Sequence, residues 1–468
     1  MAVISVAKSS NLDTSNLPPY VSYWSKNKLK LSGYFALLTT TCVLMCGTAF
    51  SWFNLVWCLQ NKYNLYVDEY WAHQSDSWYT IASGLNPLGS AISGFINTRW
   101  GARVSSAFCT IISTVGAIMI CVSFYQRKQT PVAGAGLCLL SFGEAGSAIY
   151  LAPMAYLFPN PTMLYTYLAA LFAASSFPFM VIEAMVKKGT DLSHAFLGFT
   201  ILIGLSGTIG TFIWPKDFVA MKTKHDEVYN PEYVTKVDGE TPAFSKKKAI
   251  MQGLSDWKFW GILCLGSLIQ IIFTCYLGSL NGQYKQIYTE LGVSKHDLSN
   301  KTYVATTVSS IISGLIGIGI TPIAQWITNN ISPKTYLTAV VWAFPTWSFF
   351  LYSKTVWSIY VTMCLFYICK TFWFSAFYSF LGLTYSGEVY GTLIGIVCLG
   401  FFVLVELSNL IKYSPSAPLP KVADISGGIC CCSYLFAVLL TLSYLGKFFK
   451  KNKNVEVEDS EQVEVEAN

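Results

Sequence analysis

The sequence predicts an all-α membrane protein, with twelve transmembrane helices in two pseudo-symmetric six-helix bundles. Of its 468 residues, 53% are hydrophobic and 16% aromatic but only 12% charged, a composition far from that of soluble domains. The apolar runs are continuous rather than alternating, and each is long enough for a helix to cross about 30 Å of hydrocarbon. A single long polar segment divides these runs into two sets of six.

The twelve helices follow from windows of about 20 apolar residues. Residues 1–32 are polar and loosely basic, and "NLPPY" at 16–20 is expected to break any helix there, so no signal peptide is expected before the first span. The predicted spans are 33–58, 77–97, 104–125, 132–157, 163–185, 195–214, 258–280, 303–326, 334–353, 356–382, 389–411 and 424–447.

The polar segments define the domain organisation. Lys and Arg are in excess in the segments that share a side with the N-terminus, which predicts that both termini are cytosolic. The plasma membrane is the expected membrane of residence. The expected parts are a cytosolic N-terminal segment at 1–32, a first bundle at 33–214, a cytosolic linker at 215–257 with a short amphipathic helix near 246–254, a second bundle at 258–447, and an acidic disordered cytosolic tail at 448–468.

Charge and cysteine usage indicate a lipid bilayer as the main partner, and no nucleic acid or cofactor. The net charge of +6 arises in the predicted cytosolic segments, where anionic lipid heads attract Lys and Arg. All fourteen cysteines lie in or beside apolar runs, which favours packing over disulfides or metal ligation. The four histidines fall in predicted loops, so no intramembrane metal centre is expected. Nothing in the sequence fixes the oligomeric state, and a monomer is sufficient.

A short basic stretch, "GFINTRWGAR" at 94–103, joins the second and third spans. A tight turn at a membrane surface needs glycine and favours cations on the cytosolic side, which is sufficient to explain its composition. At the matching place in the second half stands "TPIAQWITNNISPK" at 321–334, which also combines a turn, a Trp and a cation. This similarity of layout is what an internal duplication would produce.

The basic stretch also resembles the signature loop of the major facilitator superfamily, G-x-L-x-D-R-x-G-R-[RK]. In that family the loop locks one face of a transporter. Thr98 stands where the family has Asp, and Ala102 stands where it has the first Arg of the final pair, so the strength of such a lock is open here. The matching positions, expected to form the conformational lock, are Gly94, Arg99, Gly101 and Arg103.

Further stretches carry a second resemblance: "SWFNLVWCLQNKYNLY", "LFPNPTMLYTYLAALFAASSFPFMVIEAMVKKGTDLSHAF", "IIFTCYLGSLNGQ" and "YSFLGLTYSGEVYGTLIGI". They resemble one branch of the superfamily, the sodium-independent, L-type large neutral amino acid transporters and the related apicomplexan amino acid transporters. The resemblance implies movement of amino acids by alternating access, as facilitated diffusion or exchange. A cation is usual in the tenth helix of this branch, and Lys370 stands near the matching position.

Charged residues inside spans are candidates for substrate binding, because each must face water or a partner. Glu144 is predicted to meet a substrate ammonium group or carry a proton, or to be hydrogen-bonded between packed helices. Lys370 is predicted to hold a substrate carboxylate, or to pair with Glu406. Glu183 lies near a span end, where it is expected to reach towards the surface.

Uncharged polar and aromatic residues complete the predicted site. Ser175 and Ser176 precede Pro178, which frees the carbonyl of Ala174 for a ligand or for packing. The superfamily resemblance implies that the first and seventh helices form gates. From these helices we expect Trp52, Asn54, Tyr276 and Asn281 to contribute to the gates or the site.

Three alternatives to amino acid transport remain open or disfavoured. A carrier of monocarboxylates or another small organic solute would use the same cation. A non-transporting sensor with a carrier fold is consistent with the missing Asp at position 98. A polytopic enzyme is disfavoured, because no paired His, Asp or Ser groups occur in the spans.

Overall fold

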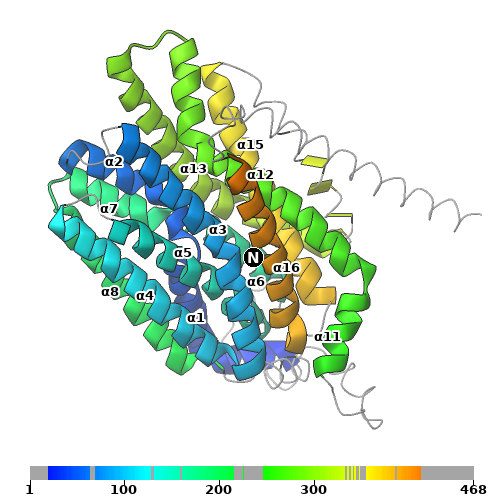
Figure 1. Ribbon diagram of the computed structural model, residues 1–468. Helices are drawn as coiled ribbons and strands as arrows, with labels where there is room; N and C mark the ends of the chain where they lie inside the picture. The colour runs from blue at the N-terminus through cyan, green and yellow to red at the C-terminus, as the bar shows by residue number, and fades with distance from the viewer. Residues whose placement is uncertain are drawn as a thin grey trace, which may run out of the picture.

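The computed structural model describes residues 19–63, 69–127, 131–158, 161–215, 225, 246–331, 355–384, 387–412 and part of 335–347, and these residues are helical apart from short turns. Helices surround the long axis of the molecule and run mostly up and down it (Figure 1). Within the described residues, seven helices are long and apolar enough to cross a membrane: Ala102–Gln126, Pro131–Leu157, Met163–Lys187, Leu192–Ile213, Asn300–Ala324, Val356–Tyr378 and Val389–Glu406.

The described helices of the first half are α1 (Pro19–Met45), η3 (Thr48–Ser51), α2 (Trp52–Tyr63), α3 (Glu69–Trp100), α4 (Ala102–Gln126), α5 (Pro131–Leu151), η4 (Ala152–Leu157), α6 (Pro161–Ala174), α7 (Phe177–Lys187) and α8 (Leu192–Ile213). Those of the second half are α11 (Lys246–Ser255), α12 (Trp257–Glu290), α13 (Lys295–Asn330), α15 (Val356–Thr384) and α16 (Gly387–Lys412). The predicted span at 424–447 and the tail at 448–468 lie outside the described residues, as does most of the span at 334–353. The short helix expected near 246–254 is confirmed as α11.

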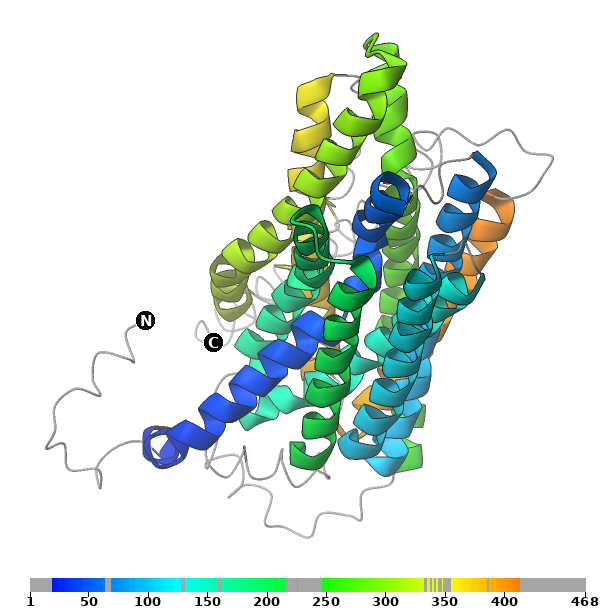
Figure 2. The ribbon, with the colours of Figure 1, turned by 90° about the vertical axis from the view of Figure 1, so that its left-hand side faces the viewer.

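The first predicted span is not one continuous helix, so the boundaries 33–58 are wrong. Helix α1 begins earlier, at Pro19, because proline is favourable in the first turn of a helix even though it breaks an interior. The helix ends at Met45, and α2 starts at Trp52 after a 3-10 turn. Gly47 sits at this break, where a side chain would lie 2.8 Å from Ser175 Oγ and 3.3 Å from the Phe172 ring. Figure 2 shows the long first helix crossing the face of the molecule.

The fifth span is also interrupted, as its proline predicts. Helix α6 ends at Ala174 and α7 begins at Phe177, with Pro178 in the first turn of α7. Proline lacks an N–H and clashes with the preceding turn, so the α-helical ladder cannot continue through it. The two breaks face each other, because Gly47 of the first contacts Ser175 of the second.

The connector between α3 and α4 is far shorter than the spans 77–97 and 104–125 predict. Helix α3 continues to Trp100, and Gly101 alone makes the turn, with φ of 85°. A positive φ is accessible to glycine at no steric cost, which explains its presence there. We call this end of the molecule the Gly101 end. The opposite end, where Gly189 turns α7 into α8 with φ of 106°, is the Gly189 end.

Two pairs of helices form the main contact between the halves: α3 packs on α16, and α6 packs on α13. The α3–α16 crossing is a close backbone approach towards the Gly101 end. A Cβ built at Gly94 would lie 2.1 Å from Gly391 O, and one at Gly395 would lie 2.9 Å from Ala91 O. Small residues allow helix backbones in a membrane to come together in this way.

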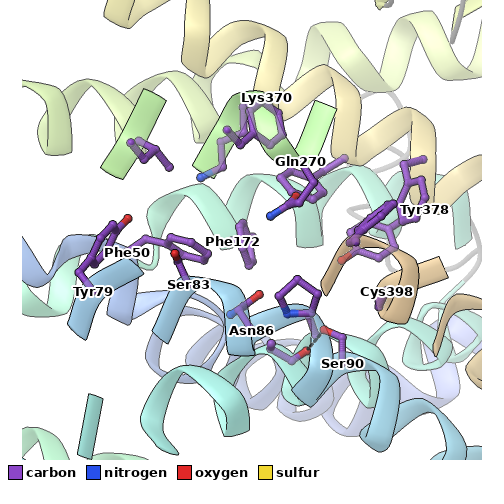
Figure 3. Close-up of a pocket in the computed structure, with 18 residues that line it drawn as sticks. Phe50, Tyr79, Ser83, Asn86, Ser90, Phe172, Gln270, Lys370, Tyr378 and Cys398 are labelled. Atoms are coloured by element: carbon purple, nitrogen blue, oxygen red, sulfur yellow. Dashed lines mark hydrogen bonds between the residues drawn. The ribbon is translucent and has the colours of Figure 1, made fainter. Parts of the chain in front are cut away.

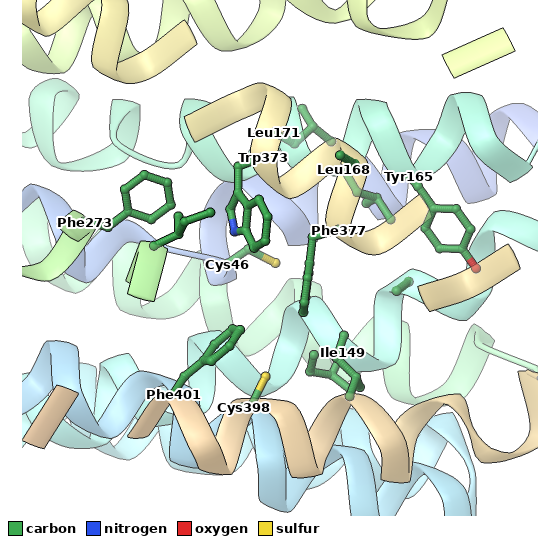
Figure 4. Packing of buried hydrophobic residues seen from close by; sticks show 14 of the residues in the cluster. Cys46, Ile149, Tyr165, Leu168, Leu171, Phe273, Trp373, Phe377, Cys398 and Phe401 are labelled. Atoms are coloured by element: carbon green, nitrogen blue, oxygen red, sulfur yellow. The ribbon is translucent and has the colours of Figure 1, made fainter. Parts of the chain in front are cut away.

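Buried side chains from both halves pack in one cluster between these contacts. Trp373 stacks on Phe377 at 5.6 Å between ring centroids, and Phe377 lies 5.8 Å from Phe401 (Figure 4). Cys46 and Ile149 of the first half lie in the same buried cluster. The helices of the two halves are thus held around a common centre, where the cavity described next lies.

Candidate functional site

A cavity lies between the two halves, about midway along the molecule. The empty space among its lining residues is about 690 Å³, and part of this space is open to the outside. Helices α3, α5 and α6 line it from the first half, and α12, α15 and α16 from the second (Figure 3). The wall residues used below are Phe50, Ser83, Asn86, Ser90, Phe172, Gln270, Lys370, Tyr378 and Cys398.

Lys370 is the charged residue among the described residues of the wall. Its side chain is 6% exposed, and its Nζ lies 5.1 Å from the Phe172 ring centroid and 5.5 Å from that of Phe50. The predicted pairing with Glu406 is not formed, because no carboxylate oxygen among the described residues lies within 4.0 Å of this ammonium group. Lys370 is therefore a buried cation held mainly against aromatic faces, which attract it weakly.

Uncharged polar groups face Lys370 from the other side of the cavity (Figure 3). Asn86 Nδ2 donates to Ser141 O at 3.2 Å, and Ser90 Oγ donates to Ala145 O at 3.0 Å. These bonds fix both side chains to α5, yet the amide oxygen of Asn86 keeps its capacity to accept. Gln270, from α12, adds a second amide to the wall. Sequence reasoning missed these groups, although uncharged amides inside apolar spans were a signal that could have found them.

A smaller cavity of about 340 Å³ adjoins the first. Ala148, Phe172 and Tyr378 belong to both walls, so these three side chains separate the two spaces. The rest of the smaller wall is mostly apolar and includes Cys42 and Leu168. It extends the hollow interior towards the Gly101 end of the molecule.

Glu144 does not line either cavity. It is fully buried on α5, where both of its carboxylate oxygens are engaged by the break between α1 and α2. Oε1 accepts from the hydroxyl of Thr48, and Oε2 accepts from the backbone N–H of Ala49 at 3.0 Å. Of the two predicted roles, the geometry matches a carboxyl group hydrogen-bonded between packed helices.

Ser175 and Ser176 occupy the α6–α7 break, close to the cavity but outside its wall. Ser175 Oγ donates to Phe172 O at 2.6 Å, and Ser176 Oγ donates to Ala173 O at 3.2 Å. Ser313 of α13 also donates to Ala173 O, at 3.3 Å. A helix of the other half therefore bonds to the carbonyl of Ala173, the neighbour of the predicted Ala174.

The two predicted gate residues of the first helix pack away from the cavity. Trp52 is buried and stacks on Phe124 of α4, with 6.4 Å between ring centroids. Asn54 is buried two residues later on α2. Phe50, just before these residues, reaches the cavity wall instead. Here the helical break determines which residue faces the cavity.

The predicted residues of the seventh helix are not brought together with Lys370. Tyr276 packs against Phe366 and Trp347, with ring centroids at 4.4 and 5.0 Å, inside the second half. Its neighbours Phe273 and Leu277 line the cavity. Asn281 is on α12, and its side chain is not among those that the structure describes.

The residues of the predicted lock are dispersed around the Gly101 end. Gly94 lies in the α3–α16 crossing, and Gly101 forms the turn. Arg99 lies over the ring of Trp100, 5.1 Å from its centroid, and Arg103 Nε donates to Trp214 O at the end of α8. Two of the four positions thus shape the backbone and two make local contacts within the first half.

A polar contact links the two halves near the Gly189 end. Glu183 forms an ion pair with Lys187 one turn later on α7, at 2.8 Å. Tyr303 of α13 donates to Glu183 Oε1, and Lys187 donates to the Tyr303 hydroxyl. The expectation that Glu183 reaches only towards the surface is wrong, because its side chain is 4% exposed and contacts the other half.

Comparisons with known proteins identify the fold. No family model matches the chain, and no curated protein matches its sequence. Among solved structures, the proton:xylose symporter XylE bound to 6-bromo-6-deoxy-D-glucose is similar, with a TM-score of 0.61, 12% identity, and coverage of 86% of this chain and 94% of that one. The chain has the major facilitator superfamily fold.

Two further structures with the major facilitator superfamily fold agree over a similar length. A double-Trp mutant of XylE matches with a TM-score of 0.61, 14% identity, and coverage of 88% of this chain and 94% of that chain. The human organic anion transporter MFSD10 (TETRAN) matches with a TM-score of 0.57, 10% identity, and coverage of 86% and 98%. Among the described residues, the wall of the cavity between the halves combines one cation, two amides and several aromatic rings.

Proposed function

We propose that the protein is a transporter that moves amino acids across a membrane by alternating access, as facilitated diffusion or exchange. The observation that carries the proposal is the cavity between the halves with Lys370 as the cation of its described wall. No carboxylate of the described residues pairs with this buried ammonium group. Burying an unpaired charge is costly, and a substrate carboxylate would offset that cost. The sequence landmarks of the amino acid transporter branch support the choice of substrate.

The wall favours neutral over cationic amino acids. No described residue of the wall is acidic, so a second positive charge on the substrate would meet Lys370 without compensation. Asn86 and Gln270 supply amide oxygens for an α-ammonium group, and the rings of Phe50 and Phe172 add cation-attracting faces. Aromatic and apolar side chains elsewhere on the wall suit an apolar substrate side chain.

A carrier of monocarboxylates or other small organic anions is the second candidate. The same absence of acidic groups from the described wall favours it, because such a substrate has no ammonium group to satisfy. One similar solved structure is named as an organic anion transporter, which is consistent with this candidate. The two candidates share Lys370 as the carboxylate-binding group and differ in the use made of the amides.

Exchange by purified protein in liposomes tests the proposal. Vesicles loaded with an unlabelled neutral amino acid should accumulate the labelled form. Competition is then measured with neutral amino acids, with α-hydroxy acids of the same side chain, and with cationic amino acids. We expect neutral amino acids to compete at least tenfold better than cationic ones. Equal or stronger competition by the hydroxy acids would favour the organic anion carrier, and absence of all exchange would favour a non-transporting sensor.

The proposal includes a topology, with both termini and the linker in the cytosol of a cell whose plasma membrane holds the protein. The excess of Lys and Arg on that side supports it. The Gly101 end would then face the cytosol and the Gly189 end the outside. Accessibility of epitope tags at the two termini, before and after permeabilisation of the cell, checks this arrangement.

A further inference from the structure

Glu144 meets the helix break that places Phe50 in the cavity wall. The break lies inside the predicted first span, and Thr48 and Ala49 are buried, so their polar groups need partners within the protein. Ala49 is in the first turn of η3, and the N–H groups of a first turn have no acceptor within their own helix. Glu144, on α5, supplies that acceptor from 95 residues away in the sequence.

The carboxylate acts as a cap supplied by a neighbouring helix. Its Oε1 accepts from the Thr48 hydroxyl while its Oε2 accepts from the Ala49 N–H. An anion at the N-terminus of a helix also interacts favourably with the helix dipole. The two donors are adjacent in sequence, so one carboxylate fixes the conformation of the whole turn.

The capped turn leads directly to the cavity. Phe50 follows Ala49, lines the cavity, and lies 5.8 Å from the Phe172 ring and 5.5 Å from the Lys370 ammonium. On the other side of the break, Gly47 is packed closely against Phe172 and Ser175. A change at the Glu144 contact would therefore move an aromatic ring that touches the cation of the site.

We propose that Glu144 is a positioning residue, which holds the break in the first span so that Phe50 is kept against Lys370 in the substrate cavity. The inference rests on the proposed transport function for its activity readout, but not for its structural readout. Direct contact with a substrate ammonium group, or proton transfer, would need a charged carboxylate. The capping role needs only hydrogen-bond groups of the right shape.

Glu144→Gln and Glu144→Ala separate these roles. The Gln amide oxygen can accept from Ala49 N–H, and its NH₂ can donate to Thr48 Oγ1, which accepts by rotation of its hydroxyl. In liposome exchange we expect E144Q to keep a half-saturation concentration within about threefold of the wild type, and E144A to raise it about tenfold or more. In a Phe50→Ala background, the further effect of E144A should fall below about twofold, because the two changes act through the same ring.

The matched control is Asp191→Ala. Asp191 also caps a helix N-terminus with a carboxylate, accepting from Ser193 N at 2.9 Å, but it lies at the α7–α8 turn, away from the cavity. This variant lowers stability without touching the break, so its exchange constants should match the wild type. If D191A and E144A lose solute exchange equally, the effect of Glu144 is general destabilisation and the proposed positioning role is wrong.

Hydrogen exchange at the amides of residues 46–52, measured by mass spectrometry on the protein in nanodiscs, gives the readout that does not depend on transport. We expect hydrogen exchange to be severalfold faster in E144A and unchanged in E144Q and D191A. Thr48→Val should give an intermediate increase, and this variant replaces E144A if E144A does not fold. Hydrogen exchange that is unchanged in both E144A and T48V would overturn the proposal. A loss of transport in E144Q as large as that in E144A would also overturn it. If the wild type exchanges no solute, the proposed function fails while the amide measurement still decides the role of Glu144.

Discussion

Lys370 and Glu144 are both buried charges in spans, but the structure places them in different environments. The ammonium of Lys370 faces a cavity and aromatic rings, whereas both oxygens of Glu144 are occupied by Thr48 and Ala49. The cost of burying a charge predicts that each must find a partner, but not which one. The cavity leaves room for a solute at Lys370 and none at Glu144.

A third carboxylate, Asp191, shows a cap in a more exposed place. Hydrogen bonds from the Ser193 hydroxyl and N–H, with Tyr63 and the Arg127 guanidinium, lower the pKa of Asp191 to about 2. The folded-state pKa is thus below the unfolded value of about 3.9, so the contribution to stability is complete above the unfolded pKa and is lost as the pH falls through about 2.

Replacing Asp191 measures how much this cap contributes to the free energy of unfolding. Asp191→Ala should lower the free energy of unfolding by about 1 kcal/mol near neutral pH, and Asp191→Asn by much less, because Asn is also a good N-cap. Thermal unfolding of the purified variants at pH 7 measures the difference. A D191A protein as stable as the wild type would show that the cap contributes nothing.

Among the described helices, sequence patterns predicted most of the spans and one of the two interruptions. The proline at 178 signalled the break between α6 and α7, since its effect is local. No local pattern marked the break after Met45, because its stability comes from Glu144 on another helix and from the close packing of Gly47. As a consequence, Trp52 and Asn54 were predicted at the site, whereas Phe50 is the residue that reaches it.

The close approach of α3 and α16 should make the protein sensitive to a larger residue at their crossing. Gly94→Ala would place a Cβ 2.1 Å from Gly391 O, so the helices must separate. Overpacking of this kind costs about 1–3 kcal/mol. Gly198→Ala on α8 is the control, because a Cβ there meets nothing within 4 Å, and alanine is the better helix former. We expect G94A to lower the unfolding temperature and G198A to keep or raise it. Equal behaviour of the two variants would contradict the close approach.

For the whole molecule, composition and the long apolar runs predicted an all-helical membrane protein, because lipid allows only helices and closed barrels to span it. The resemblance of residues 94–103 to the signature loop predicted the superfamily fold. The position of the cavity wall was less accessible to sequence reasoning. Lys370 was found through its charge, but Asn86, Gln270 and Tyr378 face the cavity only because of how six helices pack around it. Many polar and aromatic residues of the spans face other helices instead, as Tyr276 does.

Contacts between the halves at both ends give a prediction for the whole molecule. Tyr303 joins α13 to Glu183 near the Gly189 end, and the α3–α16 crossing lies towards the Gly101 end. The proposed alternating access requires these contacts to open in turn. The test is the reaction of a cysteine placed at Ser83 with a labelling reagent added from one side of the membrane. Tyr303→Phe should increase labelling severalfold when the reagent is added on the Gly189 side. Gly391→Val should do the same when the reagent is added on the Gly101 side. Both variants are made in a background without reactive native cysteines. Equal changes in labelling from the two sides would contradict the assignment of one closing contact to each end.

The most direct test of the account is exchange of a labelled neutral amino acid by purified protein in liposomes, compared between the wild type and Lys370→Met. Methionine keeps the length and apolar character of the side chain and removes its charge. We predict saturable exchange by the wild type and at least a tenfold loss of exchange efficiency in K370M, with folding unchanged. Exchange that persists undiminished in K370M would contradict the role of the cavity cation.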